Sequence, residues 1–217
     1  YQAIAAAGVI VDVFTGEVIA LASLPDFNPN EPASALVKDT FNRITSGIFE
    51  PGSTFKTITI AGALDSGAVG INDQFDARYG IRFGRYTIDD FHGKHRILSL
   101  PEVYKYSSNI GTIRVMQAMG KDNFREFLSR MKFDERVEFE LPEMRVPTVP
   151  KTLSEVGAAT ASFGHGLSIS PLHLVTAYAA FVNGGNYIAP TIYKRDMAEA
   201  EQLYERVISE QTSEAIS

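Results

Sequence analysis

The 217 residues, of which 45% are hydrophobic, suffice for one domain with a sizeable core. The 20 basic and 26 acidic residues give a formal charge of −6 without a basic block, which argues against a nucleic-acid partner. The absence of cysteine excludes thiol chemistry, and the sequence has no histidine spacing typical of a metal site, no nucleotide-binding glycine loop and no membrane-spanning apolar run, so we expect no metal or cofactor.

The chain is predicted to begin with a β-hairpin. Apolar residues alternate or run together over 5–13 and 17–23, on either side of Thr15-Gly16. A polar loop with three prolines follows, and the pattern over 34–45 then predicts a helix.

A second helix is predicted over 54–64, directly after the turn signal Pro51-Gly52. It is apolar nearly all round, as in a helix buried at the centre of a fold, and 65–67 predict its end. Ser53 therefore lies at a helix N-terminus, where free N–H groups and the helix dipole favour developing negative charge.

Ser53 and Lys56 are three residues apart, so a helix places them on one face, within reach for the amine to accept the hydroxyl proton. Serine needs such a base to act as a nucleophile, and the pair predicts acyl transfer through a covalent intermediate on Ser53. Lys56 must then be neutral near pH 7, so its pKa must fall from about 10.4, and burial and the helix N-terminus both lower it. The structural alternative is an ordinary N-cap serine.

The same tetrad recurs at Ser129-x-x-Lys132, and the 16 serines and 8 lysines predict about 0.6 matches by chance. Ser129 ends the charged, amphipathic pattern of 121–128, so we interpret this second match as a solvated helix end. The turn and the buried helix around Ser53 distinguish the first match from the second.

The rest of the chain is predicted to be mainly helical. Residues 74–90 indicate short strands or loops, and 138–151 indicate a proline-rich, extended excursion. Helical patterns cover these segments: 100–106, 110–119, 121–131, 172–182 (closed by two glycines) and the start of a helix at 209–217. Helices therefore dominate, and the hairpin needs a sheet partner.

Ser107-x-Asn109, between two predicted helices, is the only Ser-x-Asn in the chain. In a turn, this hydroxyl and amide can face one cleft, where the hydroxyl relays a proton and the amide holds a base or a substrate carbonyl. The alternative is a common turn or helix cap. Two such motifs, in this order and about fifty residues apart, are stronger evidence together than either alone.

These motifs resemble the transpeptidase domain of class B penicillin-binding proteins, close to the septal cell-division type. The likeness spans roughly residues 4–190. It is also carried by further segments: 7–20, 24–30, 42–43, 162–172 and 183–185. The resemblance implies an α/β (α+β) sandwich with helices flanking a central antiparallel sheet, and residues 1–217 as the larger, N-terminal part of one such domain.

The resemblance also implies a D,D-transpeptidase that cross-links peptidoglycan stem peptides ending in D-Ala-D-Ala. Ser53 is then the nucleophile, Lys56 its base and Ser107 the relay of a proton to the leaving D-Ala. Asn109 holds Lys56 and the amide of the donor peptide. β-Lactams mimic the donor and acylate Ser53. Other cell-division membrane proteins are implied as partners, at the periplasmic face of a cytoplasmic membrane and with an anchor outside this sequence.

Two features depart from the family pattern. His165 stands where glutamine is common, which we interpret as a tolerated loop substitution. The third motif, Lys followed by Ser or Thr and then Gly, is missing. In the family its strand forms one wall of the cleft and supplies one oxyanion-hole N–H, a donor whose loss typically costs about 10²–10³ in rate. We therefore expect a chain that stops before this motif, with an incomplete sheet and no activity alone.

Three alternatives remain open. A class A β-lactamase needs a deacylating carboxylate, typically in a Glu-x-x-Leu-Asn loop, and the sequence lacks that string. A β-lactam sensor domain is acylated and signals without cross-linking. A non-catalytic scaffold keeps the fold and binds other division proteins, and the missing third motif favours it for this chain.

Overall fold

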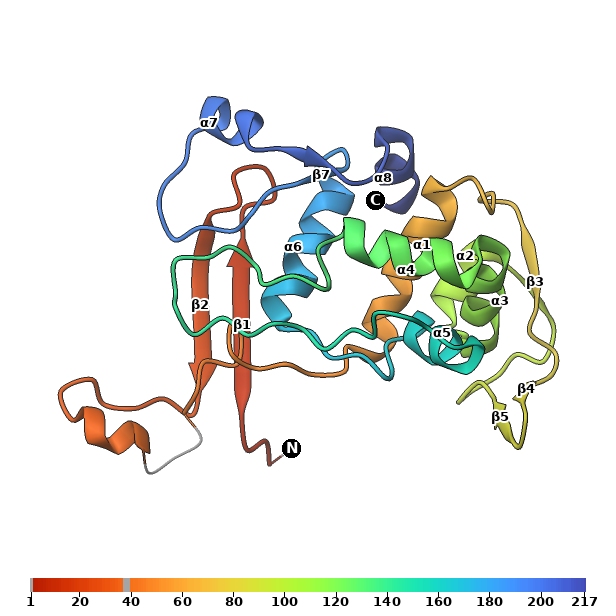
Figure 1. Cartoon of the computed structure of the whole chain (residues 1–217), viewed down its shortest axis with the longest axis horizontal. Coiled ribbons are helices and arrows are strands. Elements are labelled where there is room, and N and C mark those ends of the chain that lie inside the picture. The colour runs from red at the N-terminus through yellow and green to blue at the C-terminus, as the bar shows by residue number, and fades with distance from the viewer. Residues whose placement is uncertain (1, 37–39) are drawn as a thin grey trace.

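The computed structural model describes residues 2–36 and 40–217. Figure 1 shows a long hairpin towards one end of the molecule and most of the helices towards the other. The described strands pair as antiparallel two-stranded ladders: β1 (Ala6–Val11) with β2 (Val18–Leu24), β3 (Gln74–Asp76) with β6 (Ile97–Ser99), β4 (Ile81–Phe83) with β5 (Tyr86–Ile88), and β7 (Asn186–Tyr187) with β8 (Glu205–Arg206).

The helices are short, with six to twelve residues each. They are α1 (Lys56–Asp65), α2 (Leu100–Lys105), α3 (Asn109–Met119), α4 (Lys121–Arg130), α5 (Glu155–Ser162), α6 (Pro171–Val182), α7 (Met197–Gln202) and α8 (Glu210–Ile216). Single 3₁₀ turns cover Pro32–Leu36 and Gly52–Phe55. Among the residues described, no helix is both long and apolar enough to cross a membrane.

The structure confirms the predicted N-terminal hairpin, whose turn is shaped by Asp12. The Asp12 carboxylate accepts hydrogen bonds from the backbone N–H groups of Phe14 (2.9 Å) and Thr15 (2.8 Å), as aspartates in turns commonly do. Within residues 2–36 and 40–217, β1 and β2 form a ladder only with each other. Backbone hydrogen bonds join the turn to Thr191, which ties the hairpin to the segment before α7.

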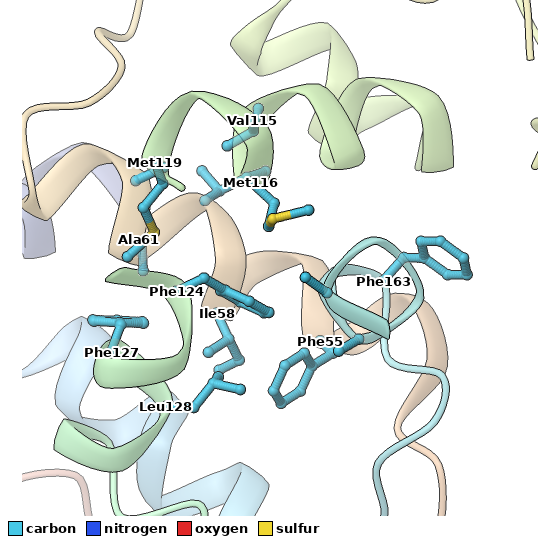
Figure 2. Close-up of a cluster of buried hydrophobic side chains, with 14 of the residues drawn as sticks. Phe55, Ile58, Ala61, Val115, Met116, Met119, Phe124, Phe127, Leu128 and Phe163 are labelled. Atoms are coloured by element: carbon cyan, nitrogen blue, oxygen red, sulfur yellow. The ribbon is translucent and has the colours of Figure 1, made fainter. Parts of the chain in front are cut away.

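The helix α1 lies in the middle of the core, as its apolar sequence predicts. All its residues from Lys56 to Ala63 are buried, and α3, α4 and α8 pack around it. Figure 2 shows Ile58 and Ala61 of α1 among buried side chains of α3 and α4. A side chain on Gly62 would place its Cβ 2.6 Å from the ring of Phe127, so a glycine here lets α4 approach α1 closely.

Most of the remaining helices lie where the sequence predicts them. The helices α2, α3, α4 and α6 match their predicted ranges to within two residues, and α8 occupies the predicted helix start at 209–217. Serine side chains cap several of them; for example, Ser108 Oγ accepts from the Gly111 N–H at 2.9 Å. Residues 138–151 contain no helix or paired strand, as predicted.

The helix predicted over 34–45 is wrong in the described part, because Pro32–Leu36 is 3₁₀ and 40–45 is not helical; 37–39 lie outside the described residues. Asn42 is the physical reason, since its side chain accepts from the Ile44 N–H at 3.0 Å and so stabilises a local turn. The sequence reading also missed α5 and α7. The helix α5 is rich in small residues and has little amphipathic periodicity, although Ser154 caps it.

Replacing Gly62 with alanine tests the close contact between α1 and α4. The new Cβ overlaps the Phe127 ring, which we expect to cost about 1–3 kcal/mol of overpacking. Alanine regains about 1 kcal/mol of helix propensity, so the net loss is up to about 2 kcal/mol. Urea unfolding measures this loss. Gly8→Ala is the control, since nothing lies within 4 Å of its Cβ. A Gly62→Ala protein at least as stable as wild type would contradict a tight contact.

Candidate active site

The predicted nucleophile and base lie at the start of the central helix. The 3₁₀ turn Gly52–Phe55 runs directly into α1, which begins at Lys56. Because a 3₁₀ turn has three residues, side chains at i and i+3 eclipse, so Ser53 and Lys56 share one edge. Ser53 is exposed, whereas Lys56 is only 2% exposed. Pro51 occupies the cap position, so Ser53 lies inside the turn and is not the N-cap residue.

The Lys56 ammonium is joined to Ser107, which lies 51 residues further along the chain. Its Nζ donates to the Ser107 hydroxyl at 2.9 Å and to the Ser107 carbonyl oxygen at 2.5 Å. Ser107 has a φ of 52°, in the left-handed region that few residues other than glycine adopt. Such strain persists only where surrounding contacts hold it. The structure therefore joins Lys56 directly to Ser107 and places Ser53 one turn before Lys56.

Burial sets the protonation of this amine. It lowers the pKa of Lys56 from 10.5 to about 8, and the negative charge of Asp90 partly offsets this by raising it. A lysine with such a pKa is neutral in roughly a tenth of the molecules at pH 7 and in about half of them near pH 8, and the neutral form is the one that can act as a general base. The dipole of α1 acts in the same direction as burial, because it disfavours a cation at a helix N-terminus.

Asp90 holds the segment that carries Ser107. One of its carboxylate oxygens accepts from the Ser108 hydroxyl at 2.7 Å, and the other accepts from the Ile110 N–H at 2.9 Å. A carboxylate is stabilised at the N-terminus of a helix, here α3. Asp90 thus fixes the turn of Ser107 and also acts electrostatically on Lys56.

Asn109 is less simply placed. It is the first residue of α3, and its side-chain amide donates to the carbonyl oxygen of Asp89 at 3.2 Å. The hydrogen bonds of the Lys56 amine go to Ser107 instead. The structure thus puts Asn109 beside the site, and its expected roles towards Lys56 and the substrate stay predictions.

A glycine-rich loop supports the turn that carries Ser53. The Gly52 N–H donates to the Gly164 carbonyl at 3.1 Å, and the Gly166 N–H donates to Glu50 Oε1 at 2.8 Å. Gly164 has a φ of 84°, and a Cβ there would lie 2.1 Å from the Gly52 oxygen. Exposed His165 places Nδ1 3.2 Å from Glu50 Oε2. The loop and the turn therefore form one unit.

Ser129 and Lys132, the second tetrad, interact with other residues, in agreement with the interpretation of this tetrad as a helix end. The Ser129 hydroxyl donates to Asp134 at 2.7 Å. Lys132 forms an ion pair with Glu205 at 2.9 Å. Both partners of the tetrad therefore have other contacts, and the lysine is paired with a carboxylate, which favours its charged form.

In the part of the chain that the structure describes, no three His, Cys, Asp or Glu side chains are grouped as metal ligands would be. An apolar cavity of about 200 Å³ borders Thr57, Ile60 and Leu64 of α1, and neither Ser53 nor Lys56 lines it.

The sequence reading did not assign Asp90 or Glu50. Asp90 lies eighteen residues before Ser108, and no local pattern predicts that its carboxylate accepts hydrogen bonds at the start of α3. The two glycines around His165 were a usable signal, since glycines are typical of close backbone approach. The partner of that loop, however, lies more than 100 residues away in the sequence.

Comparison with known proteins identifies the family of the chain. The sequence model of the penicillin binding protein transpeptidase domain matches residues 6–217. The chain is 36% identical over 208 residues to the probable peptidoglycan D,D-transpeptidase FtsI of Caulobacter vibrioides, covering 96% of this chain and 35% of that protein. It is 33% identical over 190 residues to the peptidoglycan D,D-transpeptidase FtsI of Escherichia coli K12, covering 87% and 32%. The chain thus spans about a third of the length of these curated relatives.

A solved structure extends the likeness to the fold. The apo structure of the TP domain from Burkholderia pseudomallei penicillin-binding protein 3 matches with a TM-score of 0.85 and 28% identity, covering 99% of this chain and 61% of that one. The predicted fold class, an α/β sandwich of the penicillin-binding protein type, is therefore confirmed. The chain belongs to the penicillin-binding protein transpeptidase domain family.

Proposed function

We propose that the intact protein is a serine-type peptidoglycan D,D-transpeptidase. The observation that carries this proposal is the buried amine of Lys56, whose pKa is lowered to about 8, one helical turn from exposed Ser53. Acyl transfer by serine needs such a base. Relatives named as peptidoglycan D,D-transpeptidases, 36% and 33% identical, support the substrate class.

In the acylation step, Ser53 Oγ attacks the carbonyl carbon of the penultimate D-Ala of a stem peptide. Neutral Lys56 accepts the hydroxyl proton as the new C–O bond forms. The tetrahedral intermediate collapses when the peptide C–N bond breaks. Ser107, hydrogen-bonded to the Lys56 amine, relays the proton to the nitrogen of the departing D-Ala. The product is an ester on Ser53.

In the second step, an amine of a neighbouring strand attacks the ester carbonyl. A new C–N bond forms, the C–O bond to Ser53 breaks, and the proton of the attacking amine returns to Ser53 through Lys56. Asn109 binds the amide of the donor peptide. A β-lactam enters the same first step, and ring opening leaves a long-lived ester on Ser53.

The oxyanion needs two donors. The Ser53 N–H, at the positive end of α1, is one of them. The other is expected from a Lys-Ser/Thr-Gly motif, and no such triplet occurs in the 217 residues. We therefore propose that residues 1–217 are part of a longer transpeptidase domain that supplies this motif, and that the chain alone is at most weakly active.

The same relatives support a proposed cellular role. Likeness to proteins named FtsI supports a role in septal wall synthesis. A peptidoglycan substrate supports a location at the periplasmic face of the cytoplasmic membrane, and other cell-division membrane proteins are the expected partners. β-Lactam antibiotics are the expected covalent inhibitors.

Labelling with a fluorescent penicillin tests the assignment of the nucleophile in the intact protein. We expect one label per molecule, on Ser53, and we expect Ser53→Ala to abolish it, because the proposed ester forms on the Ser53 oxygen. Gel fluorescence and peptide mass mapping measure both outcomes.

Ser129→Ala is the matched control, since it removes the serine of the second tetrad and should leave labelling unchanged. Labelling that survives Ser53→Ala, or that maps to Ser129, would overturn the assignment. An acylated protein that forms no cross-links with a donor and an acceptor peptide would indicate a β-lactam sensor instead.

The pH dependence of acylation tests Lys56 as the base. Its rate should rise with pH through a pKa of about 8. The charge of Asp90 raises that pKa, so Asp90→Asn should lower it and move the rising limb to lower pH. Stopped-flow measurement of the rate of acylation by a chromogenic cephalosporin, between pH 5.5 and 9.5, gives the position of this rise.

Ser108→Ala provides the control for this experiment. It removes a hydrogen bond to Asp90 but keeps the carboxylate charge, so the rate can fall while the limb stays in place. The electrostatic role of Asp90 would be contradicted if the rising part of the pH–rate profile moved equally in both variants. It would also be contradicted if Asp90→Asn moved this rise to higher pH.

A further inference from the structure

Positive charge gathers next to the candidate site in a chain that is acidic overall. Residues 78–106 contain six Lys or Arg and three Asp or Glu, whereas the whole chain has a net charge of −6. This segment runs from β4 and β5 to α2 and ends at the residue before Ser107. The excess of positive charge is therefore local to the approach to Ser107.

Three of these cations surround the exposed ring of Tyr106. Lys94 Nζ lies 4.9 Å from the ring centroid, Lys105 Nζ 5.7 Å and Arg96 Cζ 5.8 Å. The negative face of an aromatic ring attracts cations at such distances. Tyr106 is 36% exposed and all three basic residues are exposed, so a solute can reach the cluster.

The three charges are not equally available. Arg96 is held by both oxygens of Glu102, at 2.6 and 2.9 Å. Among the described residues, Lys94 and Lys105 form no ion pair with a carboxylate. Two like charges beside one ring repel each other, and an anion bound between them would relieve that repulsion.

The cluster lies at the edge of the proposed reaction site. Tyr106 directly precedes Ser107, whose hydroxyl and carbonyl accept from Lys56, and adjacent Cα atoms are about 3.8 Å apart. An extended peptide advances about 3.3 Å per residue, so a substrate that runs from Ser107 past Tyr106 would bring its upstream groups within reach of a lysine side chain. Peptidoglycan stem peptides carry carboxylates on the residues before D-Ala-D-Ala.

We propose that Lys94 and Lys105, gathered on the Tyr106 ring, form a subsite for a carboxylate of the stem peptide upstream of its D-Ala-D-Ala end. The subsite selects peptides whose upstream carboxylates are free over peptides in which they are amidated. This inference rests on the proposed transpeptidase function, because that function supplies the peptide.

Peptide binding to the intact protein tests the subsite, in a Ser53→Ala background that prevents acylation. The probes are a fluorescent pentapeptide ending in D-Ala-D-Ala with free upstream carboxylates and the same peptide with those groups amidated; both keep the terminal carboxylate. We expect Lys94→Gln with Lys105→Gln to raise the Kd of the free-carboxylate peptide roughly three- to tenfold at low salt. The Kd of the amidated peptide should stay unchanged.

Lys194→Gln is the matched control, because it removes an exposed lysine just before α7, which Figure 1 shows far from α2. It should change neither Kd. Tyr106→Phe keeps the ring and should bind as wild type, whereas Tyr106→Leu should weaken binding of the free-carboxylate peptide. An unchanged Kd in the double variant, or an equal change for both peptides, would overturn the subsite.

Penicillin labelling separates this inference from the function on which it rests. A double lysine variant that carries Ser53 should still be labelled. The carboxylate of penicillin corresponds to the terminal carboxylate of the peptide, and penicillin has no counterpart of the upstream carboxylate that the subsite binds. If the wild-type protein is not labelled at Ser53, the proposed function fails, and the peptide comparison still decides whether the lysines bind carboxylates.

Discussion

The hydrogen bond between the buried amine of Lys56 and Ser107 is the interaction on which the rest of the site depends. An ammonium group placed in the core loses hydration, which lowers its pKa to about 8 and keeps part of the population neutral. The hydroxyl and carbonyl of Ser107 satisfy the amine at the same time. A lysine in solvent would stay charged, and a buried lysine without partners would be costly.

The packing of the fold holds this pair in place. The helix α1 is buried between α3, α4 and α8, so Lys56 is carried into the core by the helix itself. Asp90 holds the Ser107 turn at the N-terminus of α3, and the loop through Gly164 supports the turn before α1. Packed helices and a supporting loop thus hold the segment that carries exposed Ser53, and such support is what preorganised catalytic groups need.

Local patterns explain what the sequence could predict. The hairpin, α1 and the helices from α2 to α4 follow from periodicity and turn residues, and the Ser53–Lys56 pair follows from spacing within one turn. Lys56 contacts Ser107 across a sequence separation of 51 residues, and Glu50 contacts Gly166 across one of 116. No local pattern specifies either contact. The false helix over 34–45 failed for a related reason, because the Asn42 side chain offered the backbone a competing turn.

The protonation of Lys56 is the central claim, and ¹³C NMR of lysine labelled at Cε measures it directly in the intact protein. A Lys56→Met variant identifies the Lys56 resonance. The structure predicts that this resonance titrates with a pKa of about 8, well below those of the exposed lysines. Titration of Lys56 together with the exposed lysines, near 10.4, would show that the amine is not desolvated and would contradict its assignment as the base.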